Sequence, residues 1–342
     1  MNELRARAPG KLVLFGDYVV LEGAPALAAA VPVFAHASFL PTAGKDGAFD
    51  IEAANLGERW QGRLDSDAAQ VAALTEAPPA LNLLVRAACA AMELTGRRLP
   101  AGRLRVDTGA FFRHGRKLGL GSSAAVLVAA MQALMRAPQV AADVRAHALS
   151  LRTLMALHRA WQRGRGSGVD VATSLHGGVI RFQLPDRAGS GAAAADLAVP
   201  LAADDGPPWV AVGVGHDSST RVALDAFAEL KRREPATYWR HLEALAQVSQ
   251  AAVEFWSLRQ HVAFVPLVRR ACEALAALGE AMGQPVVTAP HAELAERAAR
   301  VGGAYKPSGA GGGDVGVAFF ASERARAAFV RGLSRTPFFR LA

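Results

Sequence analysis

One acidic side chain, Asp170, stands alone in a stretch of small residues that reads GRGSGVDVATSLHGG and covers residues 164–178. A solvated loop would tolerate this composition but would not need it. A carboxylate that must come close to a crowded anionic ligand would need it, because Gly166, Ser167 and Gly168 leave room where larger side chains would collide. We therefore interpret Asp170 as a candidate catalytic group that works beside phosphates.

A second segment, KLGLGSSAAVLVAAM at residues 117–131, has the composition of a phosphate-binding turn. Gly119 and Gly121 permit backbone angles closed to other residues, and two serines then begin an apolar helix whose first N–H groups lack helical partners. Free amides and the helix dipole favour a phosphate there. The segment has no Walker Gly-Lys-Ser/Thr motif, and its G-x-G-x-x-A spacing is a weak sign of dinucleotide binding. Taken alone, it could also be a plain glycine turn with a serine cap.

Two more glycine-rich segments each carry a lysine. In residues 8–31, Lys11 follows Pro-Gly, where its ammonium group could reach a phosphate or pair with a carboxylate. In residues 306–320, five glycines fall within eight positions, too many for a packed element, so the backbone could press against a ligand. Only five of the 38 basic residues are lysines, and Lys11, Lys117 and Lys306 lie in these glycine-rich segments. This coincidence favours a shared anion site over three flexible loops.

The elements that must position these residues alternate between strands and helices. Short apolar or alternating runs predict strands on both sides of Gly16 and at residues 104–107, 209–215 and 315–320. Helical spacing predicts helices at residues 82–95, 122–135 and 143–162 (with Asp143 as a possible cap), four more between residues 220 and 300, and a last one opened by Ser322 and Glu323. Strands interleaved with helices in both halves indicate an α/β or α+β protein.

The segment 186–208 has the low-complexity Pro/Gly/Asp composition of a surface connection. A chain of 342 residues suits two domains. We therefore predict domains at residues 1–185 and 209–342, joined by this loop.

Composition argues against several classes of protein. With 51% hydrophobic and 20% charged residues the chain resembles a soluble globular protein, and no apolar run is long enough to cross a membrane. Cys89 and Cys272 have no metal-ligand spacing, so we expect no disulfide or zinc framework and a cytoplasmic location. The net charge of +8 could indicate nucleic-acid binding, but the arginines are scattered and not interleaved with aromatic residues. We expect small-molecule partners, no nucleic acid and no membrane, and a monomer or homodimer.

Taken in order, the three glycine-rich segments resemble the three motifs of the GHMP small-molecule kinases, and the similarity runs over nearly the whole chain. The middle motif, GLGSSAA, is the most specific. The resemblance implies an α+β protein with two domains and the active site between them. The N-terminal domain would contain a left-handed β-α-β crossover, and the C-terminal domain would be ferredoxin-like.

The resemblance also implies the cofactors ATP and Mg²⁺ and roles for individual residues. Lys11 and Asp170 would be catalytic and face the transferred phosphoryl group, and Ser123 would bind Mg²⁺. The ATP phosphates would be held by the middle motif: Lys117, Gly119, Leu120, Gly121, Ser122, Ser123 and Ala124. The acceptor would be bound by residues of the motifs and of the segment HDSSTR: Lys11, Ser167, Asp170, Ser218, Ser219, Thr220, Arg221, Gly309, Ala310 and Gly311. The two serines and Thr220 could equally form a plain helix cap.

The charges near the motifs bear on the acceptor. Family members that phosphorylate the alcohol mevalonate carry a magnesium-binding glutamate upstream of the catalytic aspartate, whereas this chain has no acid between Asp143 and Asp170 and has Arg159 at the aligned position. A phosphate monoester is already mostly dianionic at pH 7, so its site needs cations more than a general base. The surplus of basic residues therefore favours a phosphorylated acceptor. An alcohol acceptor and a catalytically silent, ligand-sensing relative are the alternatives.

Overall fold

The computed structural model describes residues 2–97, 99–185, 197–215 and 220–341. Two compact units make up the chain: unit 1 contains residues 1–10, 32–112 and 121–177, and unit 2 contains residues 11–31, 113–120 and 178–342. These units are not the continuous segments expected from the sequence, because strands β1 (Leu4–Phe15) and β2 (Ala26–Pro41) contribute residues to both. The division into family domains at residues 185 and 209 stays a prediction.

Unit 1 contains a sheet in which each strand contributes one buried face. The second half of β2 pairs antiparallel with β5, β5 pairs parallel with β3, and β3 pairs antiparallel with β4. Buried and exposed residues alternate along β5, as expected where one face of a sheet is packed. The bounds of these strands are β3 (Ala48–Ala53), β4 (Glu58–Arg63) and β5 (Gly102–Asp107).

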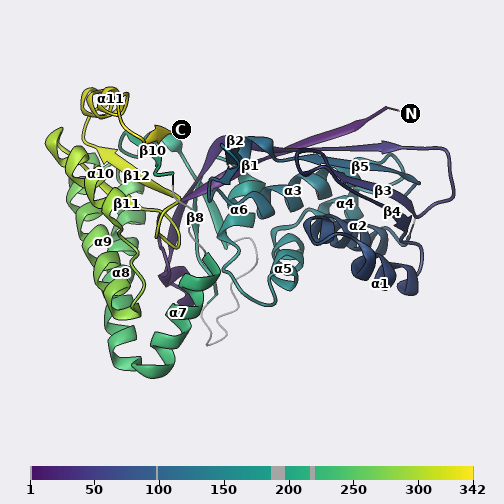
Figure 1. Ribbon diagram of the computed structural model, residues 1–342, viewed down its shortest axis with the longest axis horizontal. Helices are drawn as coiled ribbons and strands as arrows, with labels where there is room; N and C mark the ends of the chain where they lie inside the picture. Colours follow the sequence, from purple (N-terminus) through teal and green to yellow (C-terminus); the bar gives the residue numbers. More distant parts are fainter. Residues whose placement is uncertain (1, 98, 186–196, 216–219, 342) are drawn as a thin grey trace. The chain divides into compact units, whose positions relative to one another are not determined.

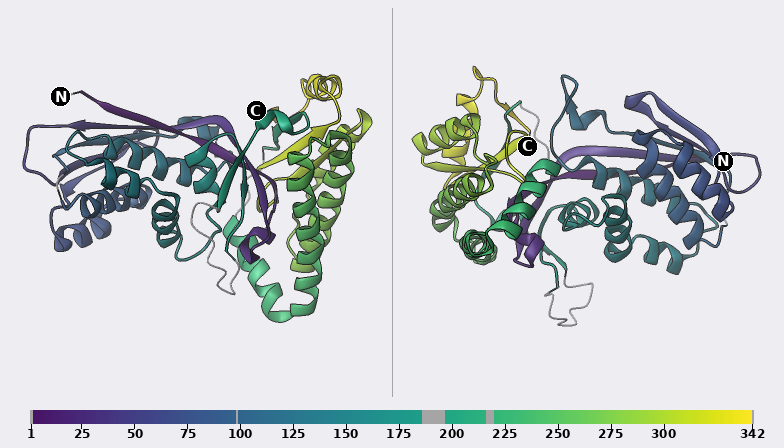
Figure 2. Two further views of the ribbon diagram at one scale, coloured as in Figure 1. Left: turned by 180° about the vertical axis from the view of Figure 1, so that it is seen from behind. Right: turned by 60° about the horizontal axis from the view of Figure 1, so that its bottom comes forward.

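Helices cover one side of these strands, as Figures 1 and 2 show for α2 and α3. Helix α3 is apolar around its whole circumference and packs against α2 and α6, so most of its side chains are buried. The α-helices of unit 1 are α1 (Asp67–Glu76), α2 (Asn82–Leu94), α3 (Ser122–Met135), α4 (Ala142–Ala148), α5 (Leu151–Trp161) and α6 (Val169–His176).

Unit 2 contains an antiparallel sheet with the strand order β11-β12-β10-β13. Helices α7 to α10 connect β10 to β11, and α11 connects β12 to β13, which gives the β-α-β-β-α-β order of a ferredoxin-like fold. Figure 1 shows the long helices α8 and α9 side by side. The predicted ferredoxin-like C-terminal portion is therefore confirmed. The bounds are β10 (Trp209–Gly213), β11 (Gly303–Pro307), β12 (Val315–Phe320), β13 (Phe339–Arg340), α7 (Thr220–Arg233), α8 (Pro235–Ser257), α9 (His261–Met282), α10 (Ala289–Arg300) and α11 (Glu323–Gly332).

The segment predicted to be an irregular connection contains a strand. The first half of β2 pairs with β8 (Val179–Phe182), and β8 pairs with β9 (Ala198–Leu201), so part of the connection extends a sheet of unit 2. Two further short strands, β6 (Phe112–Arg113) and β7 (Arg116–Lys117), form a hairpin before the middle motif. Four residues of the predicted connecting loop therefore form strand β9, which its Pro/Gly/Asp-rich composition did not indicate.

Two predicted elements have a different form in the structure. The run after Gly16 is not a strand but a 3-10 turn, Val19–Glu22, closed by Gly23 in a left-handed conformation. The helix expected over residues 143–162 is two helices, because Ser150 accepts a hydrogen bond from the N–H of Thr153 and starts α5. Asp143 does not cap α4 but lies in its first turn.

The other helix predictions are confirmed. Helix α2 ends just before Gly96, α3 spans the predicted residues 122–135, and Ser322 caps α11 by accepting from the N–H of Ala325. Both cysteines are free thiols. Among the described residues, no helix combines the length and the apolar character needed to span a bilayer.

Candidate active site

The start of helix α3, in unit 1, leaves its first amides without a side-chain cap. Gly121 precedes the helix with φ +73°, a left-handed conformation that favours glycine, and no side chain caps the first amides. Ser122 and Ser123 follow as the first helical residues and are only partly buried, whereas Ala124 is buried. The amides and hydroxyls of this terminus are therefore available to a phosphate.

His158 links two candidate site residues of unit 1. Its Nε2 lies 3.0 Å from Ser123 Oγ, and its Nδ1 lies 3.8 Å from Asp170 Oδ2. The imidazole is 2% exposed and stacks on Trp161, with ring centroids 5.6 Å apart. Ser123 and Asp170 are 47 positions apart in the sequence. In the structure each of them lies next to a different nitrogen of the same buried ring.

Asp170 lies in the first turn of α6, and its carboxylate is 19% exposed. Gly168, two positions before it, has φ +87°, so glycine is needed there for the backbone, and a Cβ would also displace the end of the Met155 side chain, 2.6 Å away. Ser167 accepts a hydrogen bond from the N–H of Val169, which is a local turn contact. The small residues around Asp170 thus have a structural cause in addition to the predicted closeness to phosphates, and substrate binding by Ser167 stays a prediction.

The Ser123 hydroxyl at the start of α3 suits a magnesium ion that is bound together with a nucleotide. Mg²⁺ prefers oxygen ligands and is usually held by one or two carboxylates, substrate phosphates and water. The Ser123 hydroxyl and the Asp170 carboxylate are oxygen donors of this kind. In the described parts of the chain no group of three or more His, Cys, Asp or Glu residues could hold a metal ion. An ion here would therefore depend on phosphate oxygens for most of its ligands.

Parts of all three glycine-rich segments meet in unit 2. The N–H of Lys11 donates to the carbonyl of Leu120 over 2.9 Å, and a Cβ on Gly309 would lie 3.7 Å from Lys11 Nζ. A Cβ on Gly119 would lie 2.5 Å from Asp314 Oδ2, so this glycine is needed for close approach. The predicted convergence is therefore present within unit 2 for Lys11, Gly119, Leu120 and Gly309.

Lys306 does not face a ligand, although it stands in a glycine-rich segment. Its side chain is 1% exposed, and its Nζ lies 2.7 Å from Asp17 Oδ2. The Asp17 side chain is only 3% exposed, so the two form a buried ion pair. The inclusion of Lys306 among anion-binding lysines was therefore wrong, because its charge is already neutralised inside the fold.

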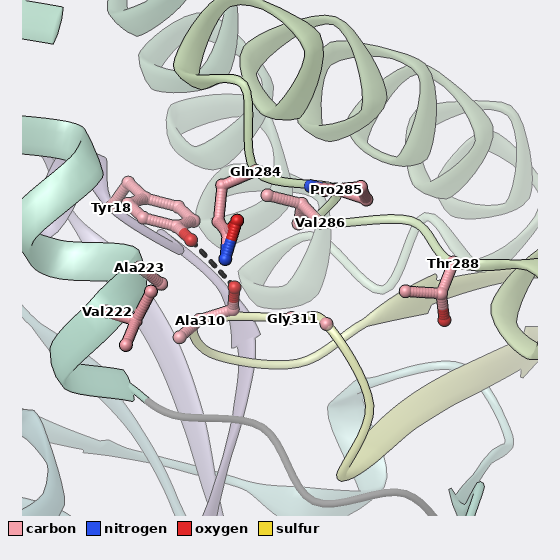
Figure 3. Close-up of a pocket in the computed structure, with 10 residues that line it drawn as sticks. Tyr18, Val222, Ala223, Gln284, Pro285, Val286, Thr288, Ala310 and Gly311 are labelled. Atoms are coloured by element: carbon pink, nitrogen blue, oxygen red, sulfur yellow. Dashed lines mark hydrogen bonds between the residues drawn. The ribbon is translucent and has the colours of Figure 1, made fainter.

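A cavity of about 310 Å³ in unit 2 lies between the third glycine-rich segment and the start of α7 (Figure 3). Its lining is mostly apolar and carries no charged side chain: Tyr18, Val222, Ala223, Gln284, Pro285, Val286, Thr288, Ala310, Gly311 and Gly312. Ala310 and Gly311, two of the residues predicted to bind the acceptor, line this cavity, and Val222 and Ala223 come directly after the predicted segment 216–221. Thr220 and Arg221 are exposed at the start of α7. Ser218 and Ser219 lie outside the described residues.

A second cavity of unit 2, of about 340 Å³, is lined mainly by basic side chains, with Asp314 as an acidic one. Lys117 is exposed and lines it together with Arg113, Arg116 and Phe339. The Arg113 guanidinium lies 4.1 Å from the centre of the Phe339 ring, and Arg116 donates to the carbonyl of Gly215. Lys117 therefore stands among cations, as a residue that binds phosphates would, and its role stays a prediction.

Sequence reasoning missed His158 and the cavity residues Gln284 and Thr288. His158 fits an apolar helical pattern that is typical of a core residue, and it is buried, but its ring edges contact Ser123 and Asp170. Nothing in the local sequence distinguishes such a histidine from a core residue. Lys11 and Asp170, expected to face the same phosphoryl group, belong to different units, so that expectation stays a prediction.

Comparison with known protein sequences gives two matches. The sequence model of the GHMP kinases N terminal domain matches residues 82–178. Phosphomevalonate kinase from Streptomyces sp. (strain CL190) is 31% identical over 352 residues, which cover 93% of this chain and 90% of that protein.

Solved structures with low sequence identity share the fold. The Lin0012 protein from Listeria innocua has a TM-score of 0.85 at 21% identity and covers 100% of this chain and 97% of its own. Phosphomevalonate kinase from Streptococcus pneumoniae, in complex with phosphomevalonate and AMPPNP, has a TM-score of 0.76 at 20% identity and covers 99% and 98%. Mevalonate kinase from Methanococcus jannaschii has a TM-score of 0.71 at 14% identity and covers 99% and 98%.

Proposed function

Because this chain belongs to the GHMP kinase family, we propose that it is a phosphomevalonate kinase of the mevalonate pathway of isoprenoid biosynthesis. It transfers the γ-phosphoryl group of ATP to the phosphate of (R)-5-phosphomevalonate and gives 5-diphosphomevalonate and ADP. The observation that carries this proposal is the 31% identity with the Streptomyces phosphomevalonate kinase along 93% of the chain. The four pieces FGDYVVLEG, KLGLGSSAA, GSGVDVATSLHGG and AYKPSGAGGGD are each similar to versions in that kind of enzyme.

One position supports a phosphorylated acceptor, the position at which family members that phosphorylate mevalonate carry a magnesium-binding glutamate. Arg159 occupies it, is exposed, and donates from Nε to the carbonyl of Gly164 over 3.1 Å. This places a cation in the turn that leads to Asp170. The second pKa of a phosphate monoester is near 6, so the acceptor arrives as a dianion that needs charge neutralisation more than deprotonation.

In phosphoryl transfer the protein mainly positions the reactants and stabilises charge, and it takes little covalent part in the reaction. The free amides and hydroxyls at the start of α3 would hold the ATP phosphates, and the ammonium group of Lys11 would neutralise charge on the transferred group. Asp170 would orient the acceptor or Lys11. Gly309, Ala310 and Gly311 would bring backbone close to the acceptor without side-chain obstruction.

We propose Mg²⁺ as the second cofactor, held through Ser123 together with phosphate oxygens of ATP and water. When bound with ATP, the ion would neutralise charge on the β and γ phosphates. His158 keeps the Ser123 hydroxyl in place for this role. The cytoplasmic location and the monomeric or dimeric state stay predictions.

The substrate test compares two acceptors with the purified protein. ADP release is followed with ATP and Mg²⁺ in the presence of phosphomevalonate or of mevalonate, and phosphorus NMR identifies the diphosphate product. An Asp170→Asn protein purified in parallel controls for contaminating kinases. Turnover of phosphomevalonate to a diphosphate is expected, and faster turnover of mevalonate would overturn the proposal in favour of a mevalonate kinase.

A further inference from the structure

Residues 308–312, within the third glycine-rich segment, have little conformational preference of their own. Gly309, Gly311 and Gly312 have φ angles of +73°, +69° and +82°, and glycine is the residue with the largest backbone freedom to lose on folding. Such a segment keeps one conformation only if other residues hold its backbone. This segment contributes Ala310 and Gly311 to the wall of the apolar cavity, so its shape decides the shape of that cavity.

Strand β1 makes the first contacts that fix the backbone of residues 308–312. The Ser308 hydroxyl accepts from the N–H of Val13 over 3.0 Å and donates to the carbonyl of the same residue over 2.9 Å. The N–H of Gly312 donates to the carbonyl of Val286 at the other end of the segment. These contacts fix the two ends, while Gly309 and Ala310 between them need separate support.

Asp17 and Lys306 supply support at Gly309. The N–H of Gly309 donates to Asp17 Oδ1 over 2.6 Å, and Asp17 Oδ2 pairs with Lys306 Nζ. Lys306 Nζ also donates to the carbonyl of Pro307 over 2.6 Å. Each partner of the ion pair therefore bonds the backbone next to or within the segment. A buried pair gains little stability over apolar residues of similar size, so its hydrogen bonds to the backbone are its distinctive contribution.

Tyr18 supplies support at Ala310. Its backbone has φ +63° and ψ −49°, a strained conformation for an aromatic residue. The ring packs on Phe227 with centroids 4.9 Å apart, and the hydroxyl donates to the carbonyl of Ala310 over 2.7 Å (Figure 3). Strain of this kind persists only where the surroundings impose it, and here it aims the hydroxyl at the cavity wall.

We propose that Asp17, Tyr18 and Lys306 are positioning residues of the acceptor site. They hold residues 308–312 as a rigid wall beside the ammonium group of Lys11, so that the acceptor meets a preformed surface. This inference rests on the proposed function for its substrate, but the contacts that it invokes all lie within unit 2. The competing interpretation is that these residues stabilise the fold and have no effect on the acceptor.

Tyr18→Phe separates the two interpretations with little risk to folding. It removes the bond to Ala310 and keeps the ring. The matched control is Tyr238→Phe, which removes the 2.8 Å bond from the Tyr238 hydroxyl to Glu22 Oε1; this ring also packs on Phe227, at 4.9 Å. We expect kcat/KM for phosphomevalonate to fall about 5- to 10-fold in Tyr18→Phe, the worth of roughly one hydrogen bond, with KM for ATP unchanged. Equal kinetics in the two variants would overturn the proposal.

The ion pair is tested by replacing both partners together. Asp17→Leu with Lys306→Met leaves no unpaired buried charge, so the protein should still fold, with a melting temperature lowered only by the loss of the two backbone hydrogen bonds. We expect amide hydrogen exchange in a peptide covering residues 307–314 to become at least about 10-fold faster without ligands, because Gly309 loses its acceptor. KM for phosphomevalonate should rise as well. Wild-type exchange and wild-type KM in a folded double variant would refute the role of the pair.

Failure of the proposed function looks different from failure of this inference. If the wild type does not phosphorylate phosphomevalonate, the proposed substrate is wrong, while the exchange measurement still tests whether Asp17 and Lys306 hold the segment. If the double variant does not fold, the kinetic comparison of Tyr18→Phe with Tyr238→Phe decides alone.

Discussion

Replacing His158 by phenylalanine tests whether the imidazole holds Ser123 and Asp170 in place. Phenylalanine keeps a flat ring that can stack on Trp161 in a site that is 2% exposed, so the fold should persist. The new ring offers no hydrogen-bond partner for the Ser123 hydroxyl, which lies 3.0 Å from Nε2 in the wild type. The change therefore removes a polar contact and little packing.

The size of the effect follows from that contact. A hydrogen bond contributes about 0.5–1.5 kcal/mol net, which is roughly 2- to 12-fold in rate at about 1.4 kcal/mol per factor of ten. Ser123 is partly exposed, so water can replace part of the loss. The second contact, 3.8 Å to Asp170 Oδ2, is too long for a hydrogen bond and adds a smaller amount. We expect kcat/KM for phosphomevalonate to fall about 3- to 10-fold.

A double-mutant cycle with Ser123→Ala shows whether His158 acts through that serine. Steady-state ADP release is measured for both single variants and for the double variant, with thermal unfolding as a check on folding. If His158 serves to hold Ser123, the double variant should be no slower than Ser123→Ala alone. Losses that multiply would refute the reasoning, because they would mean that the two side chains act independently.

Three further predictions concern catalysis, folding and pH. Asp170→Asn should lower turnover by about 10² or more while ATP binding, followed by calorimetry, persists; near-normal turnover would make Asp170 a loop residue. Gly16→Ala should cost about 1–3 kcal/mol in urea unfolding, because Gly16 has φ +98° and a Cβ would lie 2.5 Å from Ala26 Cβ; unchanged stability would contradict this. Burial lowers the pKa of His291 from 6.5 to about 4, so unfolding free energy should decline as pH falls from 6.5 to 4, where the unfolded chain takes up a proton that the folded chain does not. This decline should be weaker in His291→Gln, and an identical pH profile for that variant would contradict the assignment.

The sequence predicts elements whose signals are local. Helix α3 begins and ends where expected, because glycine precedes it and a continuous apolar run fills it. The turn Val19–Glu22 could not be predicted, since its apolar residues would fit a strand equally well. Its form depends on Tyr18 and Val19 packing in a cluster with residues of α7, α8 and α9, such as Phe227, which is information that no short window contains.

The same limit applies to the site. The glycine-rich segments and Asp170 stand out because their composition is unusual over a few residues. His158 does not, because it approaches Ser123 and Asp170 only through the packing of α3, α5 and α6. From the sequence alone, His158 cannot be distinguished from a buried histidine that makes no contact with a site.

Lys11 and Lys306 show that the role of a lysine depends on whether a distant acid neutralises it, which the local sequence does not reveal. Both lysines stand in glycine-rich segments, yet Lys11 approaches Gly309 while Lys306 is neutralised by Asp17. Removing one partner of a buried pair leaves an uncompensated charge and costs about 3–5 kcal/mol, so Asp17 and Lys306 behave as one unit. The bond from Gly309 to Asp17 spans 292 positions, and the third glycine-rich segment therefore takes its shape from the end of the first strand. A glycine-rich segment combines free backbone with a specific surface only when a distant, rigid element holds it in this way.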